Sequence, residues 1–247
     1  MPELLNVQDI ADMIDHSLLR PELTDEDVRE GCRIARENTC VSVCVKPADV
    51  RLSAHELAGS KVLVTTVVGF PHGSSTTETK LCEARVALAD GAVELDMVLN
   101  IGKLRSGENA YVEDEIRRIC ELAHPAGALV KVILENHYLT DAQKVAACTL
   151  AERAGVDFVK TASGFAATGA TLADLKLMRR TCSDKVRIKA AGGVRTLDDA
   201  LAVRAVGTSR FGATQTIAIL AEAKKRAAAG TLVMPLDPGR LSGELKK

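Results

Sequence analysis

The chain has 247 residues, of which 47% are hydrophobic and 26% are charged, a composition typical of a folded globular protein with a sizeable core. Its 32 Lys and Arg residues are balanced by 33 Asp and Glu residues, so it lacks the positive field with which a protein holds nucleic acid. Its seven Cys form no C-x-x-C pair, and no basic leader or long apolar run is present. We therefore expect a cytoplasmic protein that binds neither nucleic acid nor membrane.

Short runs rich in Val, Ile and Leu recur along the chain and predict eight strands. They cover residues 13–19, 41–45, 62–68, 92–99, 129–134, 156–160, 186–189 and 208–211. Their starts lie 21 to 37 residues apart, which leaves room each time for a strand, a helix and two short loops.

The segments between these runs carry the start and stop signals of helices. A Ser or Thr three residues before an acid or Gln predicts a capping box at five places: Thr24 with Asp27, Ser75 with Glu78, Thr140 with Gln143, Thr171 with Asp174, and Thr196 with Asp199. A Gly just before the next strand predicts a helix end at Gly59, Gly91, Gly127, Gly155 and Gly207.

Strands that alternate with helices predict parallel pairing with right-handed crossovers, and eight such units close a barrel. The sequence therefore predicts one (β/α)8 TIM barrel, an α/β fold, as a single domain over residues 1–247. The rival is an open doubly wound sheet, but its usual glycine-rich dinucleotide turn, G-x-G-x-x-G, is absent from the sequence.

Charged residues inside these apolar strands need an explanation, because barrel strands are covered on both faces. Period-2 alternation places eight of them on inward faces or strand ends. The acidic members are Asp15, Glu94, Asp96 and Glu135, and the basic members are Lys131, Lys160, Arg187 and Lys189. We expect this set to form a balanced ionic cluster in the barrel, because an unpaired buried ion costs several kcal/mol. For any single member, a solvated strand end or a structural ion pair is an equally good interpretation.

Lys160 and Lys189 end adjacent strands at the carboxyl end of the barrel, where barrel active sites lie. Two ammonium groups about 6 Å apart repel by roughly 2.8 kcal/mol at an effective dielectric near 20, and this lowers the pKa of one of them. The sequence therefore predicts a neutral lysine that attacks a carbonyl, with Asp96 as a candidate proton shuttle.

Two glycine-containing loops at the same end predict a phosphate site. Ala191-Gly192-Gly193-Val194-Arg195 follows the seventh strand, and Gly212-Ala213-Thr214 follows the eighth, each directly before a helix. Backbone N–H groups at glycines and helix N-termini favour anions there. Ser163 and Gly164 are a candidate third edge, although a Gly near a strand end is also what a tight turn needs.

Several of these segments together resemble the deoxyribose-phosphate aldolase family. They begin with Ile14-Asp15-His16-Ser17-Leu18-Leu19 and continue with Val67-Val68-Gly69-Phe70-Pro71, Glu94-Leu95-Asp96-Met97-Val98-Leu99-Asn100-Ile101-Gly102, Phe158-Val159-Lys160-Thr161 and Lys189-Ala190-Ala191-Gly192-Gly193-Val194-Arg195. The resemblance implies that Lys160 forms a Schiff base, that Lys189 lowers its pKa, and that Asp96 relays protons through water. Asp15 and Thr161 join the two loops and Ser163-Gly164 as candidate substrate-binding residues.

The same resemblance implies reversible cleavage of 2-deoxy-D-ribose 5-phosphate to D-glyceraldehyde 3-phosphate and acetaldehyde, without a metal or other cofactor, and a homodimer. The chain departs from the family at Ala162-Ser163, at Phe165, at Thr214-Gln215 and in the tail Leu245-Lys246-Lys247. These differences leave phosphate affinity and substrate choice open.

Two other functions remain open from the sequence. One is a different lysine-dependent aldolase that acts on another, or an unphosphorylated, aldehyde or sugar. The other is a catalytically silent barrel that binds sugar phosphates. A metal-dependent aldolase is a weaker alternative, since the five His residues show no H-x-H or H-E-x-x-H spacing.

Overall fold

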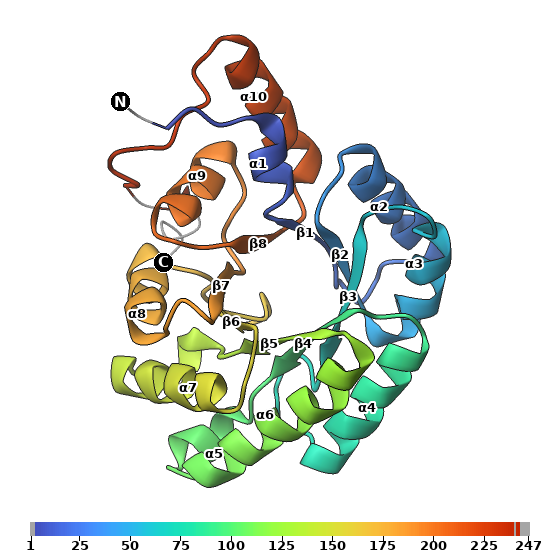
Figure 1. Ribbon diagram of the computed structural model, residues 1–247, viewed down its shortest axis with the longest axis vertical. Coiled ribbons are helices and arrows are strands. Elements are labelled where there is room, and N and C mark those ends of the chain that lie inside the picture. Colours follow the sequence, from blue (N-terminus) through green and yellow to red (C-terminus); the bar gives the residue numbers. More distant parts are fainter. Residues whose placement is uncertain (1–2, 240, 243–247) are drawn as a thin grey trace.

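The computed structural model describes residues 3–239 and 241–242, and within them eight parallel strands close into a barrel in chain order, β1 next to β2 and on to β8, which pairs with β1 (Figure 1). The predicted (β/α)8 fold is thereby confirmed. The strands are β1 (Ile14–Leu18), β2 (Ser42–Val45), β3 (Leu63–Val68), β4 (Glu94–Val98), β5 (Leu129–Ile133), β6 (Phe158–Lys160), β7 (Arg187–Ala190) and β8 (Arg210–Ala213). Each lies within a few residues of its predicted run.

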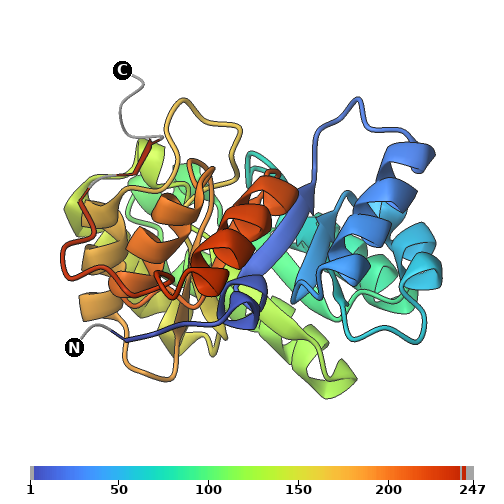
Figure 2. The same cartoon turned by 90° about the horizontal axis from the view of Figure 1, so that it is seen from above.

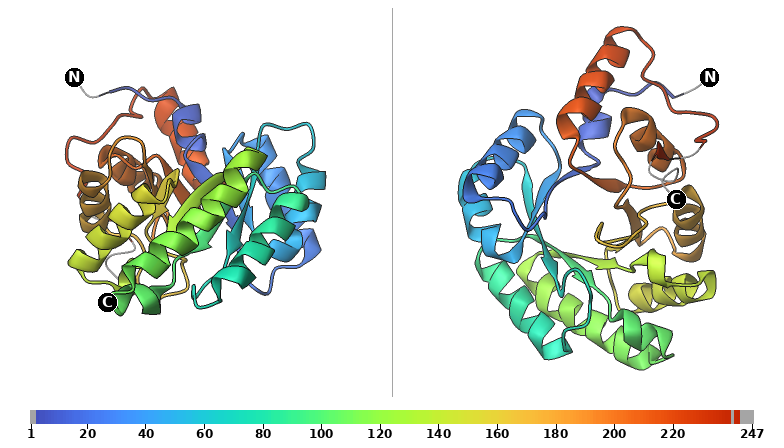
Figure 3. Two further views of the ribbon diagram at one scale, coloured as in Figure 1. Left: turned by 60° about the horizontal axis from the view of Figure 1, so that its bottom comes forward. Right: turned by 180° about the vertical axis from the view of Figure 1, so that it is seen from behind.

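Helices surround this barrel on the outside, as the views from above and from behind show (Figures 2 and 3). They are α1 (Val7–Ala11), α2 (Asp25–Glu37), α3 (Val50–Glu56), α4 (Thr77–Ala89), α5 (Ile101–Arg105), α6 (Asn109–Ala123), α7 (Asp141–Arg153), α8 (Leu172–Thr181), α9 (Leu197–Ala205) and α10 (Thr216–Ala228), with short 3-10 turns at Pro47–Asp49, His124–Ala126 and Asn136–Tyr138. In the part of the chain that the structure covers, no helix is both long and apolar enough to cross a membrane.

The helix boundaries follow the capping residues closely. Thr24, Thr140 and Thr196 form the predicted capping boxes at α2, α7 and α9, and Thr171 caps α8 by accepting a hydrogen bond from the N–H of Asp174. The prediction for Ser75 was wrong. Thr76, one residue later, accepts a hydrogen bond from the N–H of Thr79 and caps α4, so Glu78 lies in the first turn, where its carboxylate pairs with Arg118. The five predicted glycines all adopt left-handed φ angles at helix ends.

Alternation along the strands separates an apolar outer face from a polar inner one. Side chains such as Leu95, Met97 and Ile188 are fully buried between the barrel and the helices. Their neighbours along the strands, such as Asp96 and Lys189, are equally buried but point into the barrel. The barrel interior is therefore a polar compartment sealed by an apolar shell, and its open carboxyl end is where solvent and ligands have access.

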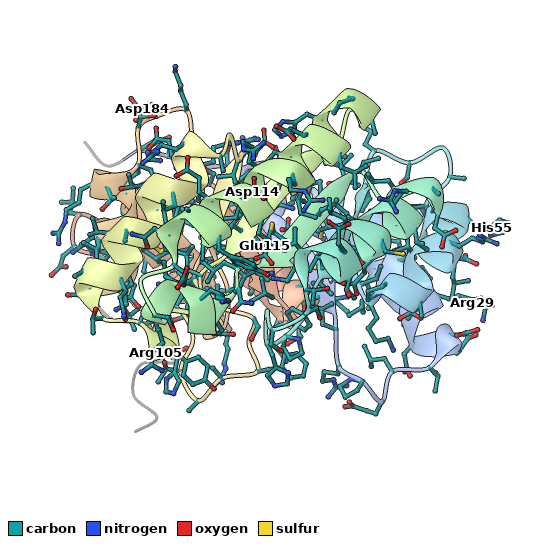
Figure 4. The ribbon with its side chains drawn as sticks, turned by 90° about the horizontal axis from the view of Figure 1, so that it is seen from below. Arg29, His55, Arg105, Asp114, Glu115 and Asp184 are labelled. Atoms are coloured by element: carbon teal, nitrogen blue, oxygen red, sulfur yellow. The ribbon has the colours of Figure 1, made fainter. Side chains whose placement is uncertain are left out.

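One buried ion pair lies outside the barrel, between α4 and α6. Lys80 Nζ is 2.9 Å from Glu115 Oε2 and donates to the backbone oxygen of Val98 at 2.8 Å, and both charged side chains are fully buried. Glu115 is labelled in Figure 4. Burial lowers the pKa of Lys80 and raises that of Glu115. The pair fastens two helices to the end of β4, and the sequence pattern gave no indication of it.

Candidate active site

Lys160 and Lys189 lie side by side in the register of β6 and β7, as predicted. The amine of each is 2.7 Å from the same oxygen, Oδ2 of Asp96, which projects from β4 two strands away. Asp96 Oδ1 accepts from the amine of Lys131 at 2.9 Å. One carboxylate thus holds three lysines together, and its pKa lies well below the usual range because their positive charges outweigh the effect of burial.

The ionic cluster differs from the predicted set in two members. Arg187 is exposed, with its guanidinium 4.0 Å from the ring centroid of Phe158, and Glu135 lies beyond β5, where it accepts hydrogen bonds from Ser163. Arg210 takes the place of Arg187. It is paired with Asp15 at 3.0 Å and with Glu94 at 2.5 Å.

The remaining contacts close the cluster into a continuous network. Lys131 is 2.5 Å from Glu94, Lys189 is paired with Asp15, Ser42 donates to Asp15 at 2.8 Å, and Thr65 donates to Glu94 at 2.6 Å. Among the described residues, this network joins three carboxylates, Asp15, Glu94 and Asp96, to four basic groups, Lys131, Lys160, Lys189 and Arg210. It is electrically neutral when one of the four basic groups has lost its proton.

The pKa shifts of the four basic groups differ in direction. Burial lowers the pKa of Lys160, and the charge of Lys189 lowers it further against the opposing effect of Asp96. For Lys189 burial acts in the same direction, but the charges of Asp15 and Asp96 outweigh it and raise the pKa. The carboxylates likewise raise the pKa of Lys131 and of Arg210 over the effect of burial. Among these four basic groups, Lys160 is therefore the one whose neutral form the site favours, whereas the carboxylates favour the charged forms of Lys131, Lys189 and Arg210.

A small apolar cluster lies at the cavity that Lys160 lines. Leu19, Cys44 and Val67 pack together, with Phe70 against them, beside the ends of β1, β2 and β3. Burial raises the pKa of the Cys44 thiol to about 11, so it is present as a neutral thiol beside the two lysines. Leu19 and Cys44 line the same cavity as Lys160, and apolar surroundings favour the uncharged form of an amine.

A cavity of about 300 Å³ opens above the two lysines at the carboxyl end of the barrel. The predicted residues that line it are Asp15, Lys160, Ser163, Gly164, Lys189, Gly192, Gly193, Val194, Arg195, Gly212, Ala213 and Thr214. Thr161 does not line the cavity. It is fully buried, and its hydroxyl exchanges hydrogen bonds with the backbone of Ala191, which ties the end of β6 to that of β7.

The two glycine-containing loops meet at one side of this cavity. Gly192 and Gly193 have φ angles of 76° and 106°, which few other residues adopt. The β6–α8 loop packs tightly on them, since a Cβ at Gly169 would lie 2.2 Å from the oxygen of Gly192. Asp199 accepts from the N–H groups of Arg195 and Thr196, so these two donors are already engaged.

Sequence reasoning missed several residues of this site. Ser17, Leu19, Arg20, Cys44 and Phe165 also line the cavity, as does Ala191 of the predicted phosphate loop. Ser17 is two residues after Asp15 on β1, so the same alternation could have found it. Arg20 and Phe165 lie in loops, where no periodic pattern applies. Ser163 lines the cavity as predicted, but its N–H and hydroxyl both donate to Glu135.

His16 points away from the cavity and links β1 to the start of α10, with Nδ1 2.8 Å from Thr216 Oγ1. Burial lowers the pKa of His16 from 6.5 to about 4. Between pH 6.5 and pH 4 the unfolded chain binds a proton that the folded protein excludes, so the free energy of unfolding should fall by about 3 kcal/mol over this window. Urea titrations from pH 7 to pH 4 measure this loss, and His16→Asn should reduce it. An equal loss in both proteins would assign the effect to other groups.

Comparisons with known proteins identify a family and several relatives of this chain. Residues 10–221 match the family described as DeoC/LacD family aldolase. Deoxyribose-phosphate aldolases of Bacillus mycoides and Bacillus cereus are 49% and 50% identical over 211 residues, which is 85% of this chain and 94% of each relative. A solved structure described as a tetrameric deoxyribose phosphate aldolase from Aeropyrum pernix is 31% identical with a TM-score of 0.83, covering 89% of this chain and 92% of that one.

Proposed function

The chain belongs to the DeoC/LacD family of aldolases, and from this membership we propose that it reversibly cleaves 2-deoxy-D-ribose 5-phosphate to D-glyceraldehyde 3-phosphate and acetaldehyde. The observation that carries the proposal is the pair of lysines at the ends of β6 and β7. Lys160 has a lowered pKa and Lys189 a raised one, and both contact Asp96. Attack on an aldehyde requires a neutral amine, and the lowered pKa of Lys160 favours that form.

The proposed reaction begins when the Lys160 amine attacks C1 of the open-chain sugar. Loss of water gives an iminium ion, which withdraws electrons from C2. The C3 hydroxyl then loses its proton, the C2–C3 bond breaks, and its electron pair forms an enamine while glyceraldehyde 3-phosphate departs. Protonation of C2 and hydrolysis release acetaldehyde and free Lys160. In this proposal Asp96, which contacts both lysines, relays these protons through water, and the charge of Lys189 lowers the pKa of Lys160.

The test of this function combines a rate with a chemical trap. Cleavage of deoxyribose 5-phosphate should release glyceraldehyde 3-phosphate, measured by a coupled dehydrogenase assay. Borohydride reduction in the presence of acetaldehyde should leave an ethyl group on Lys160, located by peptide mass mapping. Turnover without any lysine label would overturn the Schiff-base proposal. A label without turnover would favour the alternative of a catalytically silent barrel that binds sugar phosphates.

For the phosphate, we propose that Gly192, Gly193 and Val194 offer backbone donors while Arg195 and Gly212-Ala213-Thr214 complete the site. The unmodified enzyme should then prefer deoxyribose 5-phosphate over deoxyribose by at least about tenfold in kcat/KM. Equal kcat/KM for the two sugars would favour a lysine-dependent aldolase of unphosphorylated substrates.

Gly193→Asp should reduce kcat/KM for the phosphorylated sugar much more than for free deoxyribose, because it adds a carboxylate beside the anion. Gly193→Ala is the matched control, since it introduces a similar strain at φ 106° without the charge. Steady-state kinetics on both sugars measure the difference. If the two variants lose the phosphate preference equally, backbone strain rather than charge is the cause.

The homodimer, the cytoplasmic location and the single-domain organisation over residues 1–247 belong to the same proposal. Sedimentation velocity measures the oligomeric state, and a tetramer, as described for the Aeropyrum pernix relative, is the other outcome. The tail Leu245-Lys246-Lys247 lies outside the described residues.

A further inference from the structure

A second cavity, of about 270 Å³, lies beside the active-site cavity at the same end of the barrel. We call it the side cavity. Its lining includes His72 after β3, Arg105 of α5, which Figure 4 labels at the edge of the molecule, and Tyr138 after β5. Among the described residues, Ser163 and Phe165 are shared by the linings of both cavities. The turn formed by residues 163–165 therefore divides one space from the other.

Phe165 provides the apolar part of this division. Its side chain is 50% exposed, and its ring meets that of Phe70 edge to face, with centroids 5.3 Å apart. Phe70 in turn packs on the cluster of Leu19, Cys44 and Val67 beside the reactive lysine. Phe165 thus continues the apolar wall of the active-site cavity outward to the point where the side cavity begins.

Glu135, which follows the end of β5, holds this turn in place. Its Oε2 accepts from the N–H of Ser163 at 3.1 Å and from the Ser163 hydroxyl. The Ser163 oxygen accepts in turn from the N–H of Phe165 at 3.1 Å. Glu135 is 2% exposed and has a left-handed backbone, with φ 55°, a conformation that disfavours residues other than glycine by roughly 1 kcal/mol or more. The hydrogen bonds to Ser163 therefore hold the Glu135 carboxylate in one position, although the backbone conformation of Glu135 is itself unfavourable.

We propose that Phe165 is a specificity-determining residue that limits the length of the acceptor aldehyde by closing the active-site cavity toward the side cavity, and that Glu135 is the positioning residue that holds it through Ser163. The inference rests on the proposed aldolase function. In the direction of synthesis, the enamine on Lys160 attacks a second aldehyde, a carbon–carbon bond forms, and the aldehyde oxygen takes up a proton. Water then releases the product from Lys160. The substituent of the acceptor extends away from Lys160, toward the walls of the cavity.

The test compares two acceptors of different size with acetaldehyde as donor. Phenylacetaldehyde requires room for a ring, whereas propanal does not. Phe165→Ala should raise the ratio of kcat/KM for phenylacetaldehyde to that for propanal by about tenfold or more, because apolar pockets discriminate by this order for small differences in size. Tyr138→Ala is the matched control, since it enlarges the side cavity but leaves the Phe165 wall intact, and its ratio should stay unchanged. An unchanged ratio in Phe165→Ala, or an equal rise in Tyr138→Ala, overturns the proposal.

The role of Glu135 is tested with the same ratio. Glu135→Ala should raise the ratio of kcat/KM for phenylacetaldehyde to that for propanal, as Phe165→Ala does. Glu135→Gln keeps an oxygen that accepts both Ser163 donors and should retain the original ratio. If Glu135→Ala does not fold, Ser163→Ala reports the same link, because it removes the oxygen that joins Glu135 to the Phe165 N–H. A ratio unchanged in the folded Ala variants would remove Glu135 from the proposal.

Borohydride trapping of the unmodified protein with acetaldehyde separates the two hypotheses. Absence of a label on Lys160 there counts against the aldolase function itself. A normal label combined with unchanged acceptor ratios in the variants counts only against the wall formed by Phe165.

Discussion

Lys160→Ala should reduce the cleavage of deoxyribose 5-phosphate by more than about 10⁴-fold, because the variant has no nucleophile with which to form the iminium ion and removal of a covalent nucleophile causes losses of this order or greater. The neighbouring Lys189 should not replace it. Its raised pKa keeps it protonated between Asp15 and Asp96, and an ammonium group cannot attack a carbonyl.

Lys189→Met separates the roles of the two lysines. The variant retains Lys160, so borohydride with acetaldehyde should still mark Lys160, but more slowly at neutral pH. Without the positive charge of Lys189, the pKa of Lys160 rises and less of the neutral amine is present. Activity of Lys189→Met should therefore recover in part as the pH is raised. A label on Lys189 in the unmodified enzyme would reverse the assignment.

Asp96→Asn should produce the second largest effect, a loss of about 10²- to 10⁴-fold in kcat/KM together with a lower thermal midpoint. The activity falls because an amide cannot relay the protons of the C3 hydroxyl and of C2. The stability falls because three buried lysines share this carboxylate, and removal of one partner of a buried ion pair typically destabilises a protein by about 3–5 kcal/mol. Stopped-assay kinetics and calorimetry measure the two losses independently.

Glu115→Gln is the matched control for Asp96→Asn. It also breaks a buried ion pair, that with Lys80, but the pair lies between α4 and α6 and outside the barrel. It should lower the thermal midpoint while leaving kcat unchanged at temperatures where the protein is folded. If Asp96→Asn behaves in the same way, Asp96 serves the fold and not the reaction.

Hydrophobic patterning alone was sufficient to predict the eight strands, their order and the fold class, because a barrel repeats one local unit and each unit carries its own strand and helix signals. The signals for helix starts are equally local. The error at Ser75 arose because Ser75, Thr76 and Thr77 are consecutive residues that each offer a hydroxyl for capping. The pairing of Lys160 with Lys189 followed from adjacent strands that end together.

Only the tertiary structure decided how far along the barrel axis each inward residue lies. Alternation assigns a side chain to a face, but the stagger between strands sets its depth. The register pairs Arg210 of β8 with Lys189 of β7, at the level of the carboxylates. Arg187 lies two residues before Lys189 on the same face of β7, at the exposed end of that strand and over the ring of Phe158. The sequence could not predict the left-handed turn at Glu135 or the apolar wall at Phe165 either. Contacts between loops that follow different strands determine both. The sequence thus determined the repeat of strands and helices and the face of each strand residue, and the packing of strands and loops determined which charged groups meet inside the barrel.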